Sequence, residues 1–209
     1  NKGRLTAKGN SISGYQQIGN AKAYLYLETE QQPTTTYALS DGKIKNISEK
    51  DNCIVFHFAD ARQINIRYGV SFISEEQAKN NLIREIPDYN IDKIIEQGRN
   101  IWNEALGKIK VKGSDENQKT IFYTSMYRVY ERPICISEDG HYYSGFDGKI
   151  HDDGGTPFYT DDWLWDTFRA AHPLRIIIDP QKENEILNSF IRMAEQRDNY
   201  WTPTFPEIG

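Results

Sequence analysis

The sequence has 209 residues, a net charge of −5 at pH 7 and a pI near 5.5. Its basic residues are scattered and form no stripe, which argues against nucleic acid as a partner because no basic surface would neutralise phosphates. No apolar run reaches the roughly 20 residues of a membrane-spanning helix. The opening NKGRLTAKGN lacks the apolar segment of a signal peptide, although Asn1 need not be the natural start.

Aromatic residues make up 12% of the chain, with 13 tyrosines and 4 tryptophans. Tyr and Trp combine a flat apolar face with a polar edge, which suits carbohydrate-binding proteins and ordinary cores alike. Composition therefore leaves both a sugar site and a plain core open. The two cysteines, Cys53 and Cys135, lie far apart and match neither a disulfide framework nor a zinc motif.

The first third of the chain predicts β-strands. Apolar and polar residues alternate over 24–29, 53–58 and 64–72, with turn signals between these segments. The last segment would bury one face, formed by Ile64, Ile66, Tyr68, Val70 and Phe72, and would expose Asn65, Arg67, Gly69 and Ser71. The pattern predicts antiparallel strands with one buried side, as in a β-sandwich.

Helical periodicity begins near residue 74. Ser74 and Gln77 form a predicted capping box, and Pro87 ends the first helix. A second helix is predicted over 91–109, where the apolar residues recur along one stripe. A third is predicted from Ser114, as its N-cap, to about residue 132.

The last third of the chain predicts more helices after an irregular segment. The Gly- and Asp-rich stretch 138–155 shows no periodicity. Helix is then predicted over 162–177, and another from Asp179-Pro180. The last helix would bury Ile186, Leu187, Phe190, Ile191 and Ala194.

Strands therefore come first and helices after. This segregation favours two domains or an α+β arrangement over a βαβ array. Neither half looks complete, since the strands are too few to close a sandwich and the chain stops at PEIG without a closing element. We expect a fragment of a larger protein.

The segment FYTDDWLWDTFRAAHPL, residues 158–174, concentrates candidate chemistry. On a helix, Asp162, Asp166 and Arg169 would share one face, with Trp165 on an adjoining face. One interpretation is a sugar platform, in which the indole packs on a pyranose and the carboxylate accepts hydrogen bonds from two hydroxyls. The alternative is structural, with a buried Trp165 and an ion pair between Asp166 and Arg169.

Other candidates are less specific. The stretch 139–155 is rich in Asp but does not have the spacing of an EF-hand, so Asp-Gly turns are the better explanation. His141 and His151 are expected to be hydrogen-bonding loop residues, and His57 a strand residue. Glycoside hydrolysis requires two carboxyl groups. Candidates are plentiful, but spacing selects no pair among Glu131, Asp147, Asp152 and Asp153.

Several runs together resemble glycoside hydrolase family 92. WNEAL, IFYTSMY, GFDGKIH and LWDTFRAAHPL occur in that order, and the resemblance spans roughly 11–209, most strongly 70–174. It implies an exo-acting, inverting, calcium-dependent α-mannosidase that hydrolyses terminal α-mannose, for example α-1,2-linked, and is secreted, periplasmic or at the cell surface. It also implies three parts: the end of an antiparallel β-sandwich at 1–73, a helical linker at 74–112 and the first helices of an (α/α)6 barrel at 113–209.

The resemblance implies roles for three residues of the WDTFR motif. Trp165 and Asp166 would line the −1 mannose pocket, Asp166 would accept hydrogen bonds from mannose hydroxyls, and Arg169 would orient Asp166. This chain departs from the family at TDDW, residues 160–163, and at YWTPTFPEIG, residues 200–209. The general acid, the general base and the calcium ligands of the family lie mainly beyond this chain, so we expect these 209 residues alone to hydrolyse nothing.

Three alternatives stay open. The first is a carbohydrate-binding protein that kept the aromatic pocket and lost catalysis. The second is a related sandwich-plus-barrel enzyme with another substrate, such as an α-glucoside phosphorylase that needs phosphate. In the third, the cluster of Trp and Asp is only core.

Overall fold

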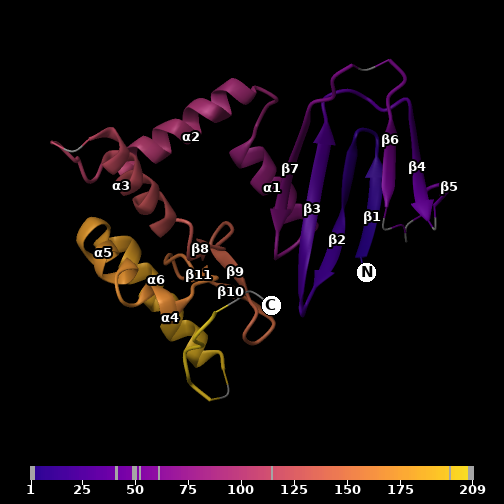
Figure 1. The fold of residues 1–209 in the computed structure, drawn as a ribbon. Helices are drawn as coiled ribbons and strands as arrows, with labels where there is room; N and C mark the ends of the chain where they lie inside the picture. The colour runs from indigo at the N-terminus through magenta and orange to yellow at the C-terminus, as the bar shows by residue number, and fades with distance from the viewer. Residues whose placement is uncertain are drawn as a thin grey trace. The chain divides into compact units, whose positions relative to one another are not determined.

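A computed structural model describes residues 3–40, 42–48, 51, 53–60, 62–113, 115–197 and 199–206. The chain forms two compact units that divide between Asn90 and Ile91. The first unit contains the larger sheets, and the second contains most of the helices (Figure 1). Antiparallel strands followed by helices are what the sequence predicted.

The first unit is built on a four-stranded antiparallel sheet in the order β1-β2-β3-β7. Its strands are β1 (Gly3–Lys8), β2 (Ser11–Ile18), β3 (Ala21–Thr29) and β7 (Ile66–Ser71). A three-stranded sheet in the order β5-β4-β6 contains β4 (Thr35–Ser40), β5 (Lys43–Lys45) and β6 (Ile54–His57). The alternating segments correspond to β3, β6 and β7, whereas β1 and β2 were not predicted because their sequences GRLTAK and SISGYQQI contain few apolar residues.

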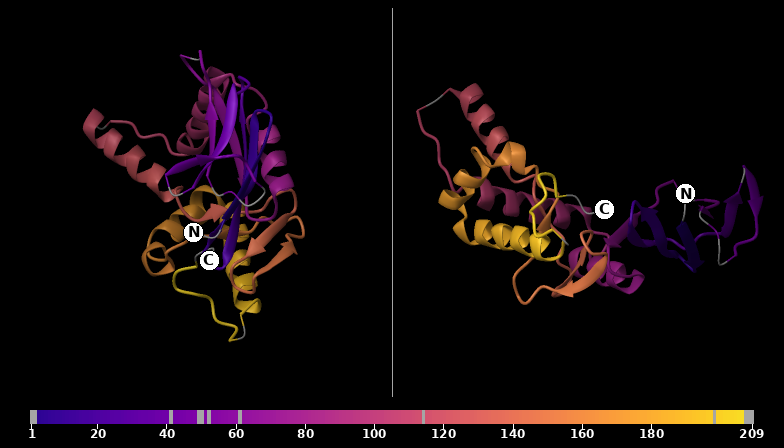
Figure 2. Two further views of the ribbon diagram at one scale, coloured as in Figure 1. Left: turned by 90° about the vertical axis from the view of Figure 1, so that its right-hand side faces the viewer. Right: turned by 90° about the horizontal axis from the view of Figure 1, so that it is seen from below.

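Helix α1 (Glu75–Glu85) begins at the predicted N-cap, since the Ser74 hydroxyl accepts from the Gln77 N–H at 3.0 Å; the Ser74 N–H itself donates to the Ser71 hydroxyl at 3.3 Å. It packs on one face of β3 and β7 (Figures 1 and 2). Close approach requires Gly69, where an added Cβ would lie 2.2 Å from the Ala78 carbonyl oxygen. The side chain of Ser71 is buried on the same face.

The prediction of which face of β7 is buried was therefore wrong. Ile66, Tyr68 and Val70 are each more than half exposed, while Gly69 and Ser71 lie under α1. Alternation fixed the two faces correctly, but the helix packs on the face with the smaller side chains because only there can its backbone come close.

The second unit opens with α2 (Ile91–Leu106) and α3 (Glu116–Val129). The N-cap of α3 is Asp115, whose carboxylate accepts from the Gln118 N–H at 2.8 Å; the predicted cap, Ser114, lies outside the described residues. The apolar stripe predicted for the second helix is not buried in this structure, where α2 has no buried residue.

The stretch 138–155 contains a hairpin that was not predicted. Strands β9 (His141–Ser144) and β10 (Lys149–Asp152) pair antiparallel, and β8 (Ile134–Cys135) pairs with β11 (Tyr159–Thr160). The predicted turns are present, since Asp139 and Gly140 both have positive φ beside this hairpin. His141 and His151 therefore lie on strands and not in a loop.

The helix predicted over 162–177 is in fact two helices, α4 (Leu164–Thr167) and α5 (Ala171–Ile178). Ala170 interrupts them with φ −137° and ψ −40°. Helix α6 (Pro180–Glu195) follows and confirms Ile186 and Phe190 as buried, but Leu187 and Ile191 are exposed. The core of this unit consists of Ile136, Tyr142, Phe158, Tyr159, Ile186, Phe190 and Met193.

The two compact units do not coincide with the three predicted parts. Helix α1, which was placed in a linker over 74–112, packs with the sheet. The division into sandwich end, linker and barrel start therefore remains a prediction. Among the described residues, no helix is long and apolar enough to cross a membrane.

Candidate functional site

Helix α4 presents Trp165 and Asp166 to solvent. The side chain of Trp165 is 65% exposed, and Asp166 is also exposed. Asp166 lines a hollow of about 510 Å³, whose described walls are formed by Arg128, Val129, Glu131, Arg132, Trp163, Asp166, Thr167, Ala170, Ala171 and Arg175. Trp165 and Arg169 are not in that set. The structural alternative of a buried Trp165 is therefore wrong for this chain.

A second indole, that of Trp163, forms part of the wall of the hollow. The guanidinium of Arg132 lies 4.2 Å from the centre of the Trp163 ring, and its Nη1 donates to Asp161 Oδ1 at 2.8 Å. An aromatic face and a cation at this distance attract each other. The indole of Trp163 is thus fixed by its contact with Arg132 and lines the same hollow as Asp166. The sequence prediction missed Trp163 because only the WDTFR motif was singled out.

Arg169 does not pair with Asp166 as the structural alternative required. Its guanidinium lies 5.5 Å from the centre of the Phe168 ring, and none of the ion pairs of the described residues joins it to Asp166. The two side chains leave from α4 and from the segment after it, because the helix ends at Thr167. The proposed role of Arg169 in orienting Asp166 stays a prediction.

Immediately behind α4 lies a buried ionic cluster. His172 Nδ1 is 2.7 Å from Glu183 Oε1, and His172 Nε2 is 3.0 Å from Asp162 Oδ2. All three side chains are buried. Burial alone would lower the pKa of His172, but its hydrogen bonds to the two carboxylates and their charges raise that pKa to about 9. His172 is therefore an imidazolium at neutral pH.

Asp162 is a structural carboxylate in this arrangement. Burial would raise the pKa of Asp162, but the hydrogen bond from His172 and its positive charge lower that pKa below its ordinary value. Asp162 Oδ1 also accepts from the Trp163 N–H at 2.9 Å. The prediction that Asp162 and Asp166 share a helical face was wrong, because α4 begins only at Leu164.

Arg175 completes the cluster from α5. Its guanidinium donates to the backbone carbonyls of Val129, at 2.8 Å, and of Arg132. The two buried carboxylates of Asp162 and Glu183 thus face two buried cations, His172 and Arg175. This pairing offsets the cost of removing the charges from water.

The remaining candidate carboxylates have separate environments. Glu131 is exposed and lines the same hollow as Asp166. Asp147 contacts the ring of His151 at 3.0 Å and lines another hollow with Gln196 and Asn199. Asp152 and Asp153 accept the N–H groups of Gly154 and Gly155 as turn residues. His57 lies on β6, as predicted.

Calcium binding requires several oxygen ligands that surround one point. Within the part of the chain that the structure describes, no three His, Cys, Asp or Glu side chains converge as metal ligands. Asp162 and Glu183 contact opposite nitrogens of His172, so their oxygens do not share a point where an ion would sit.

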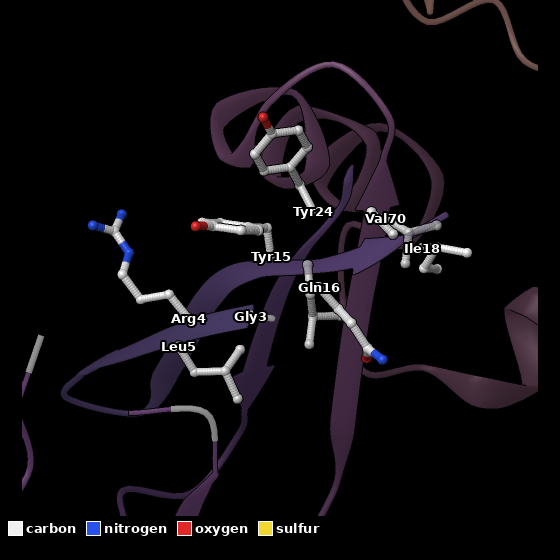
Figure 3. Close-up of a pocket in the computed structure, with 10 residues that line it drawn as sticks. Gly3, Arg4, Leu5, Tyr15, Gln16, Ile18, Tyr24 and Val70 are labelled. Carbon is white, nitrogen blue, oxygen red and sulfur yellow. The ribbon is translucent and has the colours of Figure 1, made fainter. Parts of the chain in front are cut away.

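The first unit has a hollow of about 440 Å³ on its four-stranded sheet (Figure 3). Tyr15 and Tyr24 project beside it from neighbouring strands, with ring centroids 6.0 Å apart. Its other described lining residues include Leu5, Leu25 and Val70, and the described lining contains no carboxylate and no histidine. The hollow beside α4, which contains the exposed carboxylates Glu131 and Asp166, is therefore the better candidate for binding sugar hydroxyls.

Comparison with known proteins identifies the family. Residues 77–209 match the glycosyl hydrolase family 92 catalytic domain, which is most of the chain. The chain belongs to glycosyl hydrolase family 92. A secreted glycosidase from Arthroderma benhamiae, described as uncharacterized, is 39% identical over 71 residues, which are 32% of this chain and 9% of that protein.

Solved structures of family 92 enzymes share the fold. The α-mannosidase BT3965 from Bacteroides thetaiotaomicron matches with a TM-score of 0.85 and 21% identity, over 98% of this chain and 30% of that one. The inverting mannosidase BT2199 from the same organism matches with a TM-score of 0.78 and 25% identity, over 93% and 29%. The present chain thus spans about 30% of these two mannosidases and 9% of the Arthroderma glycosidase.

Proposed function

We propose that these residues are part of an exo-acting, inverting α-mannosidase that removes terminal α-mannose, for example α-1,2-linked, from glycans outside the cytoplasm. The observation that carries the proposal is the exposed pair Trp165 and Asp166 on α4, beside a hollow, in a family 92 chain. Family 92 structures include α-mannosidases, one of them in complex with mannoimidazole, and a relative is described as secreted.

The proposed division of labour follows from exposure. Trp165 supplies an apolar face for the C–H side of the sugar, and Asp166 accepts hydrogen bonds from mannose hydroxyls. Neither group performs acid–base catalysis. The acid, the base and the calcium ligands are contributed by other residues of a longer protein, and these 209 residues alone are inactive.

The open face of β7 fits the same proposal. Ile66, Tyr68 and Val70 would be covered in the longer protein by the second sheet of the β-sandwich, because apolar rows of this kind are buried between facing sheets. The exposed apolar stripe of α2 would likewise pack in the linker and the (α/α)6 barrel.

The proposal is tested by a proton NMR time course on the full-length protein with an α-mannobiose, in calcium and then in EDTA. Early appearance of β-mannose that EDTA abolishes is the expected result. Early appearance of α-mannose would contradict inversion, and activity unchanged by EDTA would contradict calcium dependence. Binding without hydrolysis would favour a carbohydrate-binding protein, and turnover only with phosphate would favour a phosphorylase.

A further inference from the structure

Helix α4 carries two proposed mannose contacts, and of its apolar side chains only Leu164, which is partly buried, packs against the core. Its four residues, Leu164–Thr167, include no buried side chain. A helix this short is not stable by itself, because nucleation costs more than a few hydrogen bonds return. The orientation of Trp165 and Asp166 therefore depends on the contacts that anchor the two ends of α4.

Both ends of α4 meet the same histidine nitrogen. Asp162 stands two residues before the helix, and its Oδ2 lies 3.0 Å from His172 Nε2. Thr167 is the last residue of the helix, and its Oγ1 lies 3.1 Å from the same nitrogen. The Thr167 hydroxyl and Asp162 Oδ2 are themselves 3.2 Å apart. One ring nitrogen thus joins the entry and the exit of α4.

The other side of the ring is anchored in the core. His172 Nδ1 lies 2.7 Å from Glu183 Oε1 on α6, the helix that supplies Ile186, Phe190 and Met193 to the core. The Phe190 ring packs edge-on against the imidazole, with centroids 5.9 Å apart. His172 therefore connects the poorly packed α4 to a well-packed helix.

We propose that His172 is a positioning residue whose imidazolium holds α4 against α6 and thereby fixes Trp165 and Asp166 for sugar binding. The inference rests on the proposed function, because mannose is the ligand those two side chains would contact. The imidazolium has two N–H donors for two buried carboxylates. A neutral imidazole keeps one donor, so either Asp162 or Glu183 loses its partner and α4 loses its anchor.

The groups around His172 set the direction of the pH effect. Asp162 faces it from the segment before α4, Glu183 from α6, and the Arg175 Nη1 from α5 at 3.5 Å from Nδ1. Tyr130, at the end of α3, interacts with the charge of Arg175. The two carboxylates outweigh burial and raise the pKa of His172 to about 9. Release of α4 is therefore expected as the pH rises through that value.

The experiment follows the indole N–H signals of Trp163 and Trp165 in the ¹⁵N-labelled full-length protein, assigned with Trp163→Phe and Trp165→Phe. Both signals are expected to shift together during an alkaline titration with a midpoint near 9. His172→Gln is expected to place them near their alkaline positions already at neutral pH and to abolish the titration. Indole signals that do not titrate, or that titrate equally in His172→Gln, would overturn the proposal.

Two further variants keep the test decisive should His172→Gln fail to fold. Thr167→Val removes only the hydroxyl and is expected to displace the Trp165 signal at neutral pH, whereas Thr167→Ser keeps the hydroxyl and the signal position. Ser144→Ala is the control: Ser144 is buried and donates to Gln196 Oε1 at 2.7 Å, in a different hydrogen-bond network. It is expected to leave the Trp165 signal unchanged. Equal displacement in the Val and Ser variants would contradict the anchor.

A mannoside arm separates this inference from the proposed function. KM for an α-mannobiose is expected to rise roughly tenfold in Thr167→Val, which corresponds to about 1.4 kcal/mol, and to stay unchanged in Ser144→Ala. If the wild-type protein neither binds nor cleaves mannosides while the indole signals titrate as predicted, the anchor stands and the proposed function fails. If mannosides are cleaved but the signals and KM do not respond to Thr167→Val, the anchor fails and the proposed function stands.

Discussion

Asp162 and Asp166 lie four residues apart in one short segment and have opposite environments. Asp162 is fully buried and contacts His172, whereas Asp166 is exposed beside a hollow. The comparison shows that one residue type serves two purposes within TDDWLWDTF. The buried carboxylate holds the segment, and the exposed one is available to a ligand. The abundance of Asp beside Trp in this segment is therefore not explained by a single sugar platform.

Replacing Asp162 and Asp166 in turn should give the largest difference in unfolding free energy. Asp162→Ala removes one of the two buried carboxylates that face His172 and Arg175, leaving two buried cations with Glu183 alone, and is expected to cost about 3–5 kcal/mol of unfolding free energy. Asp166→Ala removes an exposed group and is expected to change that free energy by no more than about 0.5 kcal/mol. Urea denaturation of both variants measures the difference. Equal losses of unfolding free energy would contradict the different roles assigned to Asp162 and Asp166.

The buried cluster also predicts how stability depends on pH. Because the pKa of His172 is raised from 6.5 to about 9, its contribution is fully present below 6.5 and is lost as the pH rises through about 9. The raised pKa corresponds to about 3 kcal/mol at most. Asp162, whose pKa is lowered, contributes stability above its ordinary value of 3.8 that is lost as the pH falls through the lowered pKa.

The matched variant for the alkaline effect is His172→Gln. Its unfolding free energy should lack the decline between 6.5 and about 9 that the wild-type protein shows. Denaturant unfolding across this pH range provides the measurement. An identical decline in both proteins would assign it to another group.

The exposed side of the segment predicts an effect on binding and not on folding. Trp165→Ala should weaken mannoside binding by about 1 kcal/mol, the scale of an aromatic contact, or roughly fivefold. Its unfolding free energy should stay within about 0.5 kcal/mol of wild type, because the side chain is 65% exposed. Calorimetric titration with a mannose analogue and urea denaturation test the two halves. A large stability loss would indicate that Trp165 is core after all.

Replacing Arg132 and Arg169 should give the smallest difference in unfolding free energy. Arg132 contacts both Trp163 and Asp161, so Arg132→Ala is expected to cost about 1 kcal/mol. Arg169 contacts only the Phe168 ring among the described interactions, so Arg169→Ala should cost no more than about 0.5 kcal/mol. Thermal unfolding of both variants measures this difference between Arg132, which has two contacts, and Arg169, which has one. A greater loss for Arg169 would contradict it.

Local signals predicted the elements well where the determinants are close in sequence. The capping of α1 by Ser74 needs only Gln77, and the end of that helix needs only Pro87. The buried face of β7 was predicted wrongly because it depends on Gly69 meeting α1, a tertiary contact that alternation cannot reveal. The hairpin β9–β10 was not predicted, since its strands of four residues are too short to show a period.

In the candidate site, too, the sequence predicted the features set by local residues and missed those set by tertiary contacts. The sequence pointed to the segment 158–174, but it could not separate Asp162 from Asp166 because a continuous helix would place both on one face. The break at Ala170 and the contact between His172 and Glu183 depend on where α6 packs. Trp163 could have been found from its place next to Asp162, although its partner Arg132 lies 31 positions earlier in the printed sequence.

The most direct test of this account is the effect of Asp166→Asn on kcat/KM for an α-mannobiose, measured in the full-length protein with its unfolding free energy. If Asp166 accepts a hydrogen bond from the sugar, kcat/KM should fall roughly 10- to 100-fold, the scale of a hydrogen bond to a charged group, with the unfolding free energy unchanged within about 0.5 kcal/mol. An unchanged kcat/KM, or a loss that only accompanies unfolding, would show that Asp166 does not contact the sugar.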